Sequence, residues 1–331
     1  MNQSIKTTIK MNNNRNIFIN KMLACLIFAI SITACDQESI FTDEQYKKVI
    51  YLASDDDHIF KAVHMLDDKI SRGYFSIGCG GSNYIDQDVS IELEPDTILF
   101  DKYNKSNFDI DTAKYAVLLD KSRYTIPSLS ATLTTDNRDA YVKLPIDINL
   151  LGLSPDTTYF VPMSIKNVSH YEVNPDKYSV LYRVYMKNDY AEQQVTTYYT
   201  SKFDKTEEGD ISRPGSASKI AHPLTKDKIR IFAGSQNFKA DTADIRKWAM
   251  VVQIDKQTKL VSLSSYASIE IEQVGEPSEN RYFEDHMMGT IYKRLFLHYR
   301  YRTLEKEALD SEPAQWSKWI TVKESLRRLE S

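Results

Sequence analysis

Alternating apolar and polar residues dominate the first half of the chain from Lys47 onward. In residues 89–93, VSIEL, the character changes at every position, so one face should be buried and the other open to solvent. Other short runs of β-branched, aromatic and aliphatic residues also have the length of strands; they cover residues 49–52, 74–77, 131–133, 141–144, 159–165 and 178–186. Turn-forming pairs such as Gly80-Gly81 and Asn174-Pro175 separate them. The pattern predicts a β-sandwich, with one short helix over residues 109–119.

The second half of the chain shows the same pattern after a junction at Asn188-Asp189-Tyr190. Strands are expected at residues 195–203, 229–232, 248–254, 260–263, 269–274, 295–301 and 316–322. Residues 206–223, rich in Glu, Ser, Gly and Pro, are expected to form a long loop, and residues 325–329 a final helical turn. The fold class is therefore all-β, with one domain over residues 46–187 and a second over residues 190–331.

A different pattern precedes the strands. An apolar run over residues 22–32 follows a basic leader, as in a secretory signal, and it is shorter than the roughly 20 apolar residues that span a membrane. It ends in Ile32-Thr33-Ala34-Cys35, which resembles the lipobox of bacterial lipoproteins. The resemblance implies a signal peptide over residues 1–34, lipid on Cys35, and a polar acidic tether over residues 35–45. The alternative is an ordinary signal peptide with a chance cysteine.

The acidic residues Asp36 and Glu38, directly after Cys35, resemble the surface-export signal of Bacteroidota lipoproteins. This resemblance implies an outer-membrane protein that is anchored by lipid and faces the extracellular side. The lipid would tether the protein to the membrane without a membrane-spanning segment.

Charge and cysteine content narrow the function classes. The formal net charge is −4 at pH 7, and removal of a leader with four basic and no acidic residues would make it −8. An acidic protein without a basic run is a poor nucleic-acid binder. After Cys25 leaves with the leader and Cys35 takes lipid, only Cys79 remains, so we expect no intrachain disulfide and a buried or half-buried thiol.

Three stretches of the first half resemble the N-terminal immunoglobulin-like domain of a Bacteroidota surface-lipoprotein family. They are Tyr103-Asn104, the run AVLL after Tyr115, and the run TYFVPMSI at residues 158–165. A related domain stands in front of family-18 endoglycosidases. The runs LFLHYRY at residues 295–301 and WSKW at residues 316–319 resemble the C-terminal domain of the same family. The resemblance implies an immunoglobulin-like β-sandwich followed by a second antiparallel β-sandwich or a lipocalin-like barrel.

The residues that could carry catalysis or bind a metal give no recognisable pattern. Asp55-Asp56-Asp57-His58, followed by His64, Asp67 and Asp68, is the densest group of candidate ligands, but it lacks the glycine and closing Glu of a calcium loop. A solvated acidic loop is the preferred interpretation. The family-18 catalytic signature and the strand–helix alternation of a barrel enzyme are both missing. We therefore expect no catalytic residue, no metal and no cofactor.

Aromatic residues are the more informative candidates, with 21 tyrosines, 13 phenylalanines and three tryptophans. An exposed aromatic ring can cover the apolar face of a sugar while neighbouring polar groups bond its hydroxyls. Trp248, Trp316 and Trp319 are the candidate ligand-binding residues. If residues 316–322 form one strand, Trp316 and Trp319 point to opposite faces. On the preceding strand Tyr299 and Tyr301 share one face, and His298, Arg300 and Arg302 share the other; Tyr198 and Tyr199 likewise divide between two faces.

Four Asp-Thr pairs match the short O-glycosylation motif known in Bacteroidota. The candidate threonines are Thr97, Thr112, Thr157 and Thr242. The alternative is that these Asp and Thr residues stabilise turns and helix ends.

The resulting hypothesis is a non-catalytic glycan-binding or accessory protein of a polysaccharide-utilisation system. The first alternative is a structural or docking subunit, for example on an outer-membrane transporter, and the second is an accessory glycoside hydrolase. Glycan binding requires an exposed aromatic ring beside hydrogen-bonding groups, docking requires a broad apolar patch, and hydrolysis requires two carboxylates across a cleft.

Overall fold

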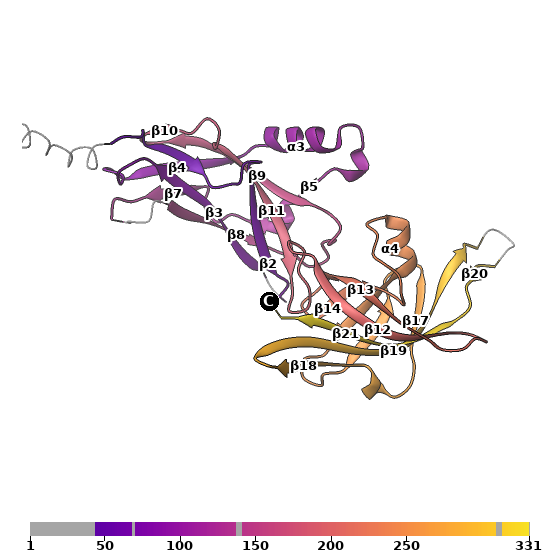
Figure 1. Cartoon of the computed structure of the whole chain (residues 1–331). Coiled ribbons are helices and arrows are strands. Elements are labelled where there is room, and N and C mark those ends of the chain that lie inside the picture. Colours follow the sequence, from indigo (N-terminus) through magenta and orange to yellow (C-terminus); the bar gives the residue numbers. More distant parts are fainter. Residues whose placement is uncertain (1–43, 68–69, 137–140, 309–312, 331) are drawn as a thin grey trace, which may run out of the picture.

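The chain folds into two β-rich domains in a computed structural model that describes residues 44–67, 70–136, 141–308 and 313–330 (Figure 1). The signal peptide, the lipidation of Cys35 and the start of the tether lie outside the described residues, as does Asp68. No helix among the described residues is long and apolar enough to cross a membrane.

The N-terminal domain is a sandwich of two sheets. One sheet has the order β10-β1-β3-β8-β6, and the other has the order β2-β11-β9-β4-β7 with β5 beside β9. The strands are β1 (Val49–Leu52), β2 (Ile59–Met65), β3 (Ser71–Gly80), β4 (Val89–Pro95), β5 (Val117–Leu118), β6 (Tyr124–Thr125), β7 (Ser130–Leu133), β8 (Tyr141–Ile148), β9 (Tyr159–Val168), β10 (Glu172–Val173) and β11 (Ser179–Lys187). Alternate residues such as Ile50, Phe75, Ile146 and Val161 form the core between the sheets.

The helix of this domain is α3 (Ile98–Phe108), so the expectation of a helix over residues 109–119 is wrong. The Asp96 carboxylate accepts a hydrogen bond from the Ile98 amide at 2.9 Å where the helix begins. The buried Asn104 side chain donates to the Ala116 carbonyl and accepts from the Ala116 amide, at 3.1 and 2.8 Å. These two bonds hold the following segment extended, apart from the short turn η1 (Thr112–Lys114), and β5 then pairs with β9.

The C-terminal domain is a single sheet that curls into a barrel. Its strands follow the order β16-β15-β14-β13-β12-β21-β19-β17, with β18 and β20 also paired to β19. They are β12 (Thr197–Glu207), β13 (Arg213–Pro223), β14 (Lys228–Phe232), β15 (Ala249–Ile254), β16 (Val261–Ser265), β17 (Ile269–Gln273), β18 (Arg281–Met287), β19 (Thr290–Lys306), β20 (Gln315–Trp316) and β21 (Ile320–Leu329). The Gln273 side chain bridges the two ends of the sheet, donating to the Val261 carbonyl at 3.0 Å and accepting from the Leu263 amide at 3.2 Å. Of the two expected architectures, the structure therefore shows the barrel.

Two further expectations for this domain are wrong. Residues 206–223 are mostly strand, because β12 and β13 form a hairpin whose connection is only residues 208–212. The inward positions of β13 include Gly215, Ala217 and Ala221, so β13 itself shows little hydrophobic pattern, and the Phe203 ring of β12 covers Gly215. Residues 325–329 belong to β21 rather than to a helical turn, and the charged Glu324 at an inward position hides the alternation.

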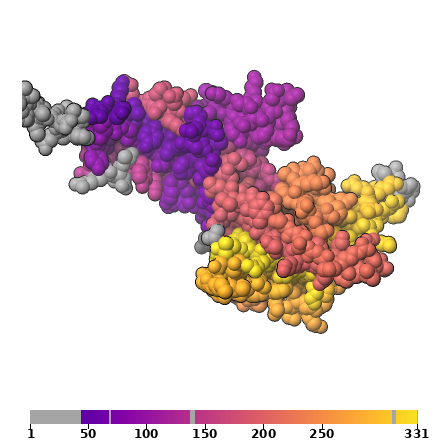
Figure 2. Space-filling model, in the orientation of Figure 1, coloured from indigo at the N-terminus to yellow at the C-terminus, as the bar shows by residue number. Residues whose placement is uncertain are grey.

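Buried polar contacts join the two domains. Asn188, between β11 and β12, donates to the carbonyls of Thr225 and Lys228 and accepts from the Tyr190 amide at 2.9 Å. Asp156 of the N-terminal domain forms a bidentate ion pair with Arg230 of β14, with N–O distances of 2.5 and 2.6 Å. In Figure 2 the indigo-to-magenta domain and the orange and yellow barrel meet along one side of each.

Candidate ligand-binding groove

The long strand β19 separates the barrel interior from an outer face. Its burial alternates along the strand, with Tyr299 and Tyr301 buried and His298, Arg300 and Arg302 on the outer side. The predicted division of these five residues is confirmed. The division of Tyr198 and Tyr199 is confirmed as well, since Tyr198 is 56% exposed and Tyr199 is fully buried.

Polar side chains occupy part of the barrel interior. The Lys219 ammonium lies 2.9 Å from Glu324, and it also donates to the Phe232 carbonyl at 2.9 Å. Ser201 and Tyr299 each donate to the Glu324 carboxylate at 2.8 Å. Complete burial and the neighbouring Glu324 raise the pKa of Tyr299 well above its ordinary value.

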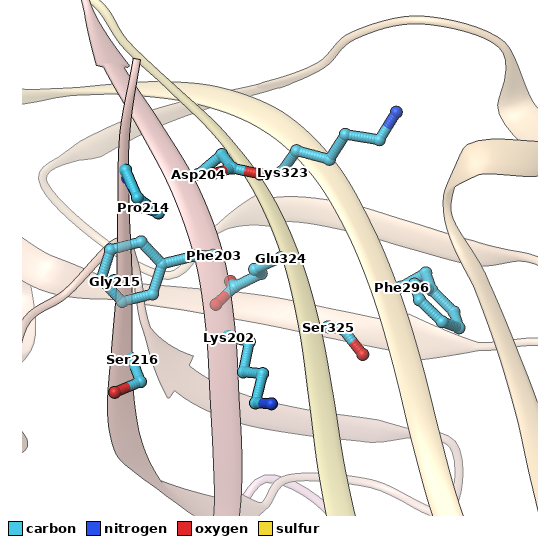
Figure 3. A pocket seen from close by; sticks show the side chains of 10 residues that line it. All are labelled: Lys202, Phe203, Asp204, Pro214, Gly215, Ser216, Phe296, Lys323, Glu324 and Ser325. Atoms are coloured by element: carbon cyan, nitrogen blue, oxygen red, sulfur yellow. The ribbon is translucent and has the colours of Figure 1, made fainter.

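On the outer face, strand register produces a shallow groove across β13, β12, β21 and β19. Ser216 pairs with Lys202, Lys202 pairs with Ser325, and Ser325 pairs with Phe296. Because side chains at paired positions point to the same face, the small Ser325 lies between Lys202 and Phe296, the small Ser216 lies on the other side of Lys202, and the two serines leave a depression. The groove has a volume of about 650 Å³, and Figure 3 shows Ser325 between Lys202 and Phe296. Phe203 and Glu324, which also line it, occupy inward positions of their strands and lie beneath the outer face.

Phe296 is the aromatic wall of the groove. Its ring stacks on Phe283 of β18, with centroids 5.2 Å apart and planes 8° from parallel. The Arg281 guanidinium lies 5.5 Å from the Phe296 centroid. These contacts support the ring from the β18 side, and the ring borders the groove on β21. A supported ring beside a polar depression is suited to stacking against the C–H face of a sugar.

Polar groups surround Phe296 within the groove. The Lys202 side chain is exposed and forms no hydrogen bond or ion pair with another residue of the described ranges, and Asp204 also lines the groove. Lys323 donates to Glu279 at 3.1 Å, and Glu279 contacts the His298 ring at 2.7 Å. The hydrogen bonds from Lys323 and His298 lower the pKa of Glu279.

Trp316 and Trp319 lie on the same outer face, so the expectation that they point to opposite faces is wrong. Only Trp316 belongs to β20, and residues 317–319 form no strand. Arg302 lies against both rings, 5.1 Å from the Trp316 centroid and 4.8 Å from the Trp319 centroid, and Arg300 lies 4.4 Å from Trp319. Guanidinium groups therefore pack on the indole rings that were candidates for binding sugar.

Trp248 ends α4 (Thr242–Trp248) and is half-buried against the barrel core. The Lys247 ammonium lies 5.3 Å from its ring centroid. The three tryptophans are thus not brought together with Phe296. Phe296, Phe283, Lys202 and Ser325 were not predicted as site residues. The alternation of outward residues along residues 290–306 could have indicated Phe296, but the other three residues lie on β18, β12 and β21.

The candidate glycosylation sites differ in their surroundings. Thr97, Thr112 and Thr242 are exposed, whereas Thr157 is half-buried at the domain junction. Asp241 caps α4 by accepting from the amides of Ala243 and Asp244, and Asp156 is engaged by Arg230. Modification of the four threonines remains a prediction.

The acidic stretch near Asp55 does not form a metal site within the described residues. Asp55 instead accepts from the amides of Asp57 and Ile59, which closes a turn before β2. His64 is buried on β2, with Nε2 2.8 Å from the Tyr182 hydroxyl and Nδ1 3.1 Å from the Ser71 hydroxyl. No group of three or more His, Cys, Asp or Glu in the part of the chain that the structure describes could hold a metal ion. Cys79 is a half-buried free thiol, and burial raises its pKa.

Comparisons with known proteins match the two-domain organisation. A family model for an N-terminal domain matches residues 46–172, and a companion model for a C-terminal domain matches residues 178–327. No curated protein matches the chain.

Several solved structures share the fold across both domains. A protein of unknown function from Bacteroides ovatus is similar with a TM-score of 0.63 and 16% identity, over 86% of this chain and 95% of that chain. A multidomain protein including DUF1735 from the same species has a TM-score of 0.60 and 16% identity, over the same shares of the two chains. An auxiliary nutrient binding protein from Bacteroides thetaiotaomicron has a TM-score of 0.56 and 13% identity, over 84% of this chain and 92% of that chain.

Proposed function

Since the chain belongs to the two-domain family that these N-terminal and C-terminal models describe, we propose that it is a non-catalytic binding protein for an extracellular glycan. Its leader and Cys35 support export and a lipid anchor on the outer face of the outer membrane. In this role the protein would serve a polysaccharide-utilisation system, beside an outer-membrane transporter.

The observation that carries the proposal is the groove at Phe296. A half-exposed ring held by Phe283 borders a depression whose floor and rim offer hydroxyl, ammonium and carboxylate groups from Ser325, Lys202 and Asp204. Stacking on the ring and hydrogen bonds at the rim are the two interactions that a sugar requires. Binding of this kind requires no cofactor.

The fold of the auxiliary nutrient binding protein from Bacteroides thetaiotaomicron also supports a binding role for this chain. The hydrolase alternative is weaker, because Glu324 beneath the groove and Glu279 beside it are already engaged. Asp204 is the other carboxylate among the described residues that line the groove, and hydrolysis requires two. Glu324 is bonded to Lys219, Ser201 and Tyr299, and Glu279 is bonded to Lys323 and His298. A glycosidase needs one carboxyl group with a raised pKa that can donate its proton.

A glycan-array screen of residues 36–331, which include every described residue, tests the proposal. The wild type should bind a defined set of glycans, and Phe296→Ala should lose that binding. Tyr84→Ala is the matched control, because Tyr84 is an aromatic residue of the N-terminal domain that is 70% exposed. Trp248→Ala, Trp316→Ala and Trp319→Ala test the three other aromatic candidates in the same screen. A folded protein that binds no glycan would favour the docking alternative, which a pull-down from outer membranes would then examine.

A further inference from the structure

A second concave site lies at the junction of the two domains, away from the Phe296 groove. It has a volume of about 210 Å³. The N-terminal domain contributes residues 155–158 and the strand β11, and the barrel contributes β13. Ligand pockets are common at domain interfaces, and this one is smaller than the roughly 300 Å³ at which drug-sized pockets begin. It therefore suits a molecule no larger than about one sugar ring.

The charges that line this junction pocket are paired, with one exception. Arg230, which is fully buried, holds Asp156 in a bidentate pair, and Lys187 lies 3.0 Å from Glu192. Arg183 has no carboxylate partner within the described part of the chain. Its neighbour across the strands, Lys61, is itself paired with Asp55 at 3.1 Å. The pocket therefore has a surplus positive charge at Arg183.

The Arg183 guanidinium is held in place by two contacts. It lies 4.5 Å from the ring centroid of Tyr185, and one of its nitrogens is 3.4 Å from the Thr158 hydroxyl. An arginine has five N–H donors in a planar fork, which matches the two oxygens of a carboxylate. Positioned on the Tyr185 ring with most of its donors unused, Arg183 is ready to bind an anion at low entropic cost.

The rest of the lining provides hydroxyl-binding groups. Thr157 and Thr158 have hydroxyl groups at the pocket, and His222 reaches it from β13. The Gln193 amide is fixed by bonds to the Pro155 carbonyl at 2.8 Å and from the Met186 amide at 3.0 Å. Together with Arg183, these groups suit a small ligand that carries one carboxylate and several hydroxyls.

We propose that the junction pocket binds a sugar acid through a bidentate contact between its carboxylate and Arg183. The ligand contacts residues of both domains, so its binding also stabilises their relative orientation. The site is independent of the glycan groove at Phe296.

The test uses residues 36–331 and three probes, namely glucuronate, glucose and inorganic sulfate. Isothermal titration calorimetry measures the binding of each probe, and thermal unfolding measures its effect on Tm. Glucuronate should bind and raise Tm, glucose should bind at least about tenfold more weakly, and Arg183→Gln should weaken glucuronate binding at least about tenfold. Arg183→Lys should also bind more weakly, because lysine keeps the charge but lacks the fork. Arg213→Gln, a change of the same charge at an exposed site, is the matched control.

Three results would overturn the proposal. The first is that glucuronate does not bind. The second is that glucuronate binds Arg183→Gln and Arg183→Lys as tightly as the wild type. The third is that sulfate binds as tightly as glucuronate. A short oligouronate separates a free sugar acid from the end of a chain. If glucuronate binds, tighter binding of the oligomer would indicate a chain end as the ligand, and weaker binding would indicate the free sugar acid. Phe296→Ala should leave glucuronate binding unchanged. A failure of the junction-pocket proposal can therefore be distinguished from a failure of the glycan-binding proposal for the Phe296 groove.

Discussion

The Lys219 ammonium lies 2.9 Å from the Glu324 carboxylate inside the barrel, and both side chains are fully buried. Hydrogen bonds from Ser201 and Tyr299 to Glu324, and from Lys219 to the Phe232 carbonyl, satisfy the pair. A buried pair of this kind contributes little net stability, but removal of one partner leaves the other charge without compensation.

Lys219→Met should therefore lower the free energy of unfolding by about 3–5 kcal/mol. Lys202→Met, on the outer face of the same barrel, should change it by less than about 0.5 kcal/mol. Urea unfolding followed by circular dichroism measures both values. The double variant Lys219→Met/Glu324→Leu should be more stable than Lys219→Met alone, and the opposite order would contradict this account of the pair.

The ion pair at the domain junction makes a second prediction. Asp156→Ala leaves the buried Arg230 guanidinium, which lies 5.0 Å from the Tyr266 ring centroid, without its carboxylate partner. The free energy of unfolding should fall by about 2–4 kcal/mol. Asp147→Ala breaks another bidentate Arg–Asp pair, but Arg72 is exposed there, so the cost should be below about 1 kcal/mol. Thermal and urea unfolding compare the two variants. Equal costs would show that burial of Arg230 is irrelevant.

Two buried histidines predict a loss of stability in acid. Burial lowers the pKa of His64 from 6.5 to about 4, and burial together with the Arg230 charge does the same for His222. As the pH falls from 6.5 towards 4, the unfolded chain takes up protons that the folded chain refuses. The contribution of these histidines to the free energy of unfolding is thus fully present above pH 6.5. As the pH falls from 6.5 towards 4, it declines by up to about 1.4 kcal/mol per pH unit for each histidine.

His64→Gln should reduce this decline, whatever its effect on stability at neutral pH. His170→Gln, at an exposed position, should leave the decline unchanged. Urea unfolding at several pH values between 4 and 7 measures the slopes. An identical slope for His64→Gln and the wild type would contradict the assignment to His64.

Trp319→Ala tests the role of the indole–guanidinium contacts. Its ring packs against Arg300 and Arg302, so its loss should destabilise the barrel by about 1–2 kcal/mol. Glycan binding should persist, because Arg300 is four residues from Phe296 along β19, which is ~13 Å. Loss of glycan binding with unchanged stability would instead assign Trp319 to the ligand.

The sequence predicts most strands correctly because their buried faces are marked by alternating apolar residues. It fails where the inward residue is unusual, as with Gly215 under Phe203 and Glu324 beside Lys219. The expectation of a helix over residues 109–119 is wrong because the contacts that stabilise this segment join Asn104 to Ala116, twelve residues away. Such contacts between distant positions are not visible in a local pattern.

The groove could not be predicted for a similar reason. It depends on register, which places Ser325 between Lys202 and Phe296 on three different strands. The tryptophans were the more obvious aromatic candidates in the sequence, yet arginines pack on Trp316 and Trp319. The alternation along residues 295–301 did predict correctly that Tyr299 is buried and Arg300 is not.

The most direct test of the proposed function is the affinity of Phe296→Ala for the glycan that the wild type binds best on the array. Isothermal titration calorimetry on residues 36–331 measures this affinity, and an unchanged Tm shows that the variant is folded. Loss of the aromatic ring that forms the wall of the groove should weaken binding at least about tenfold. An affinity equal to that of the wild type and of Tyr84→Ala would contradict the assignment of the glycan site to this groove.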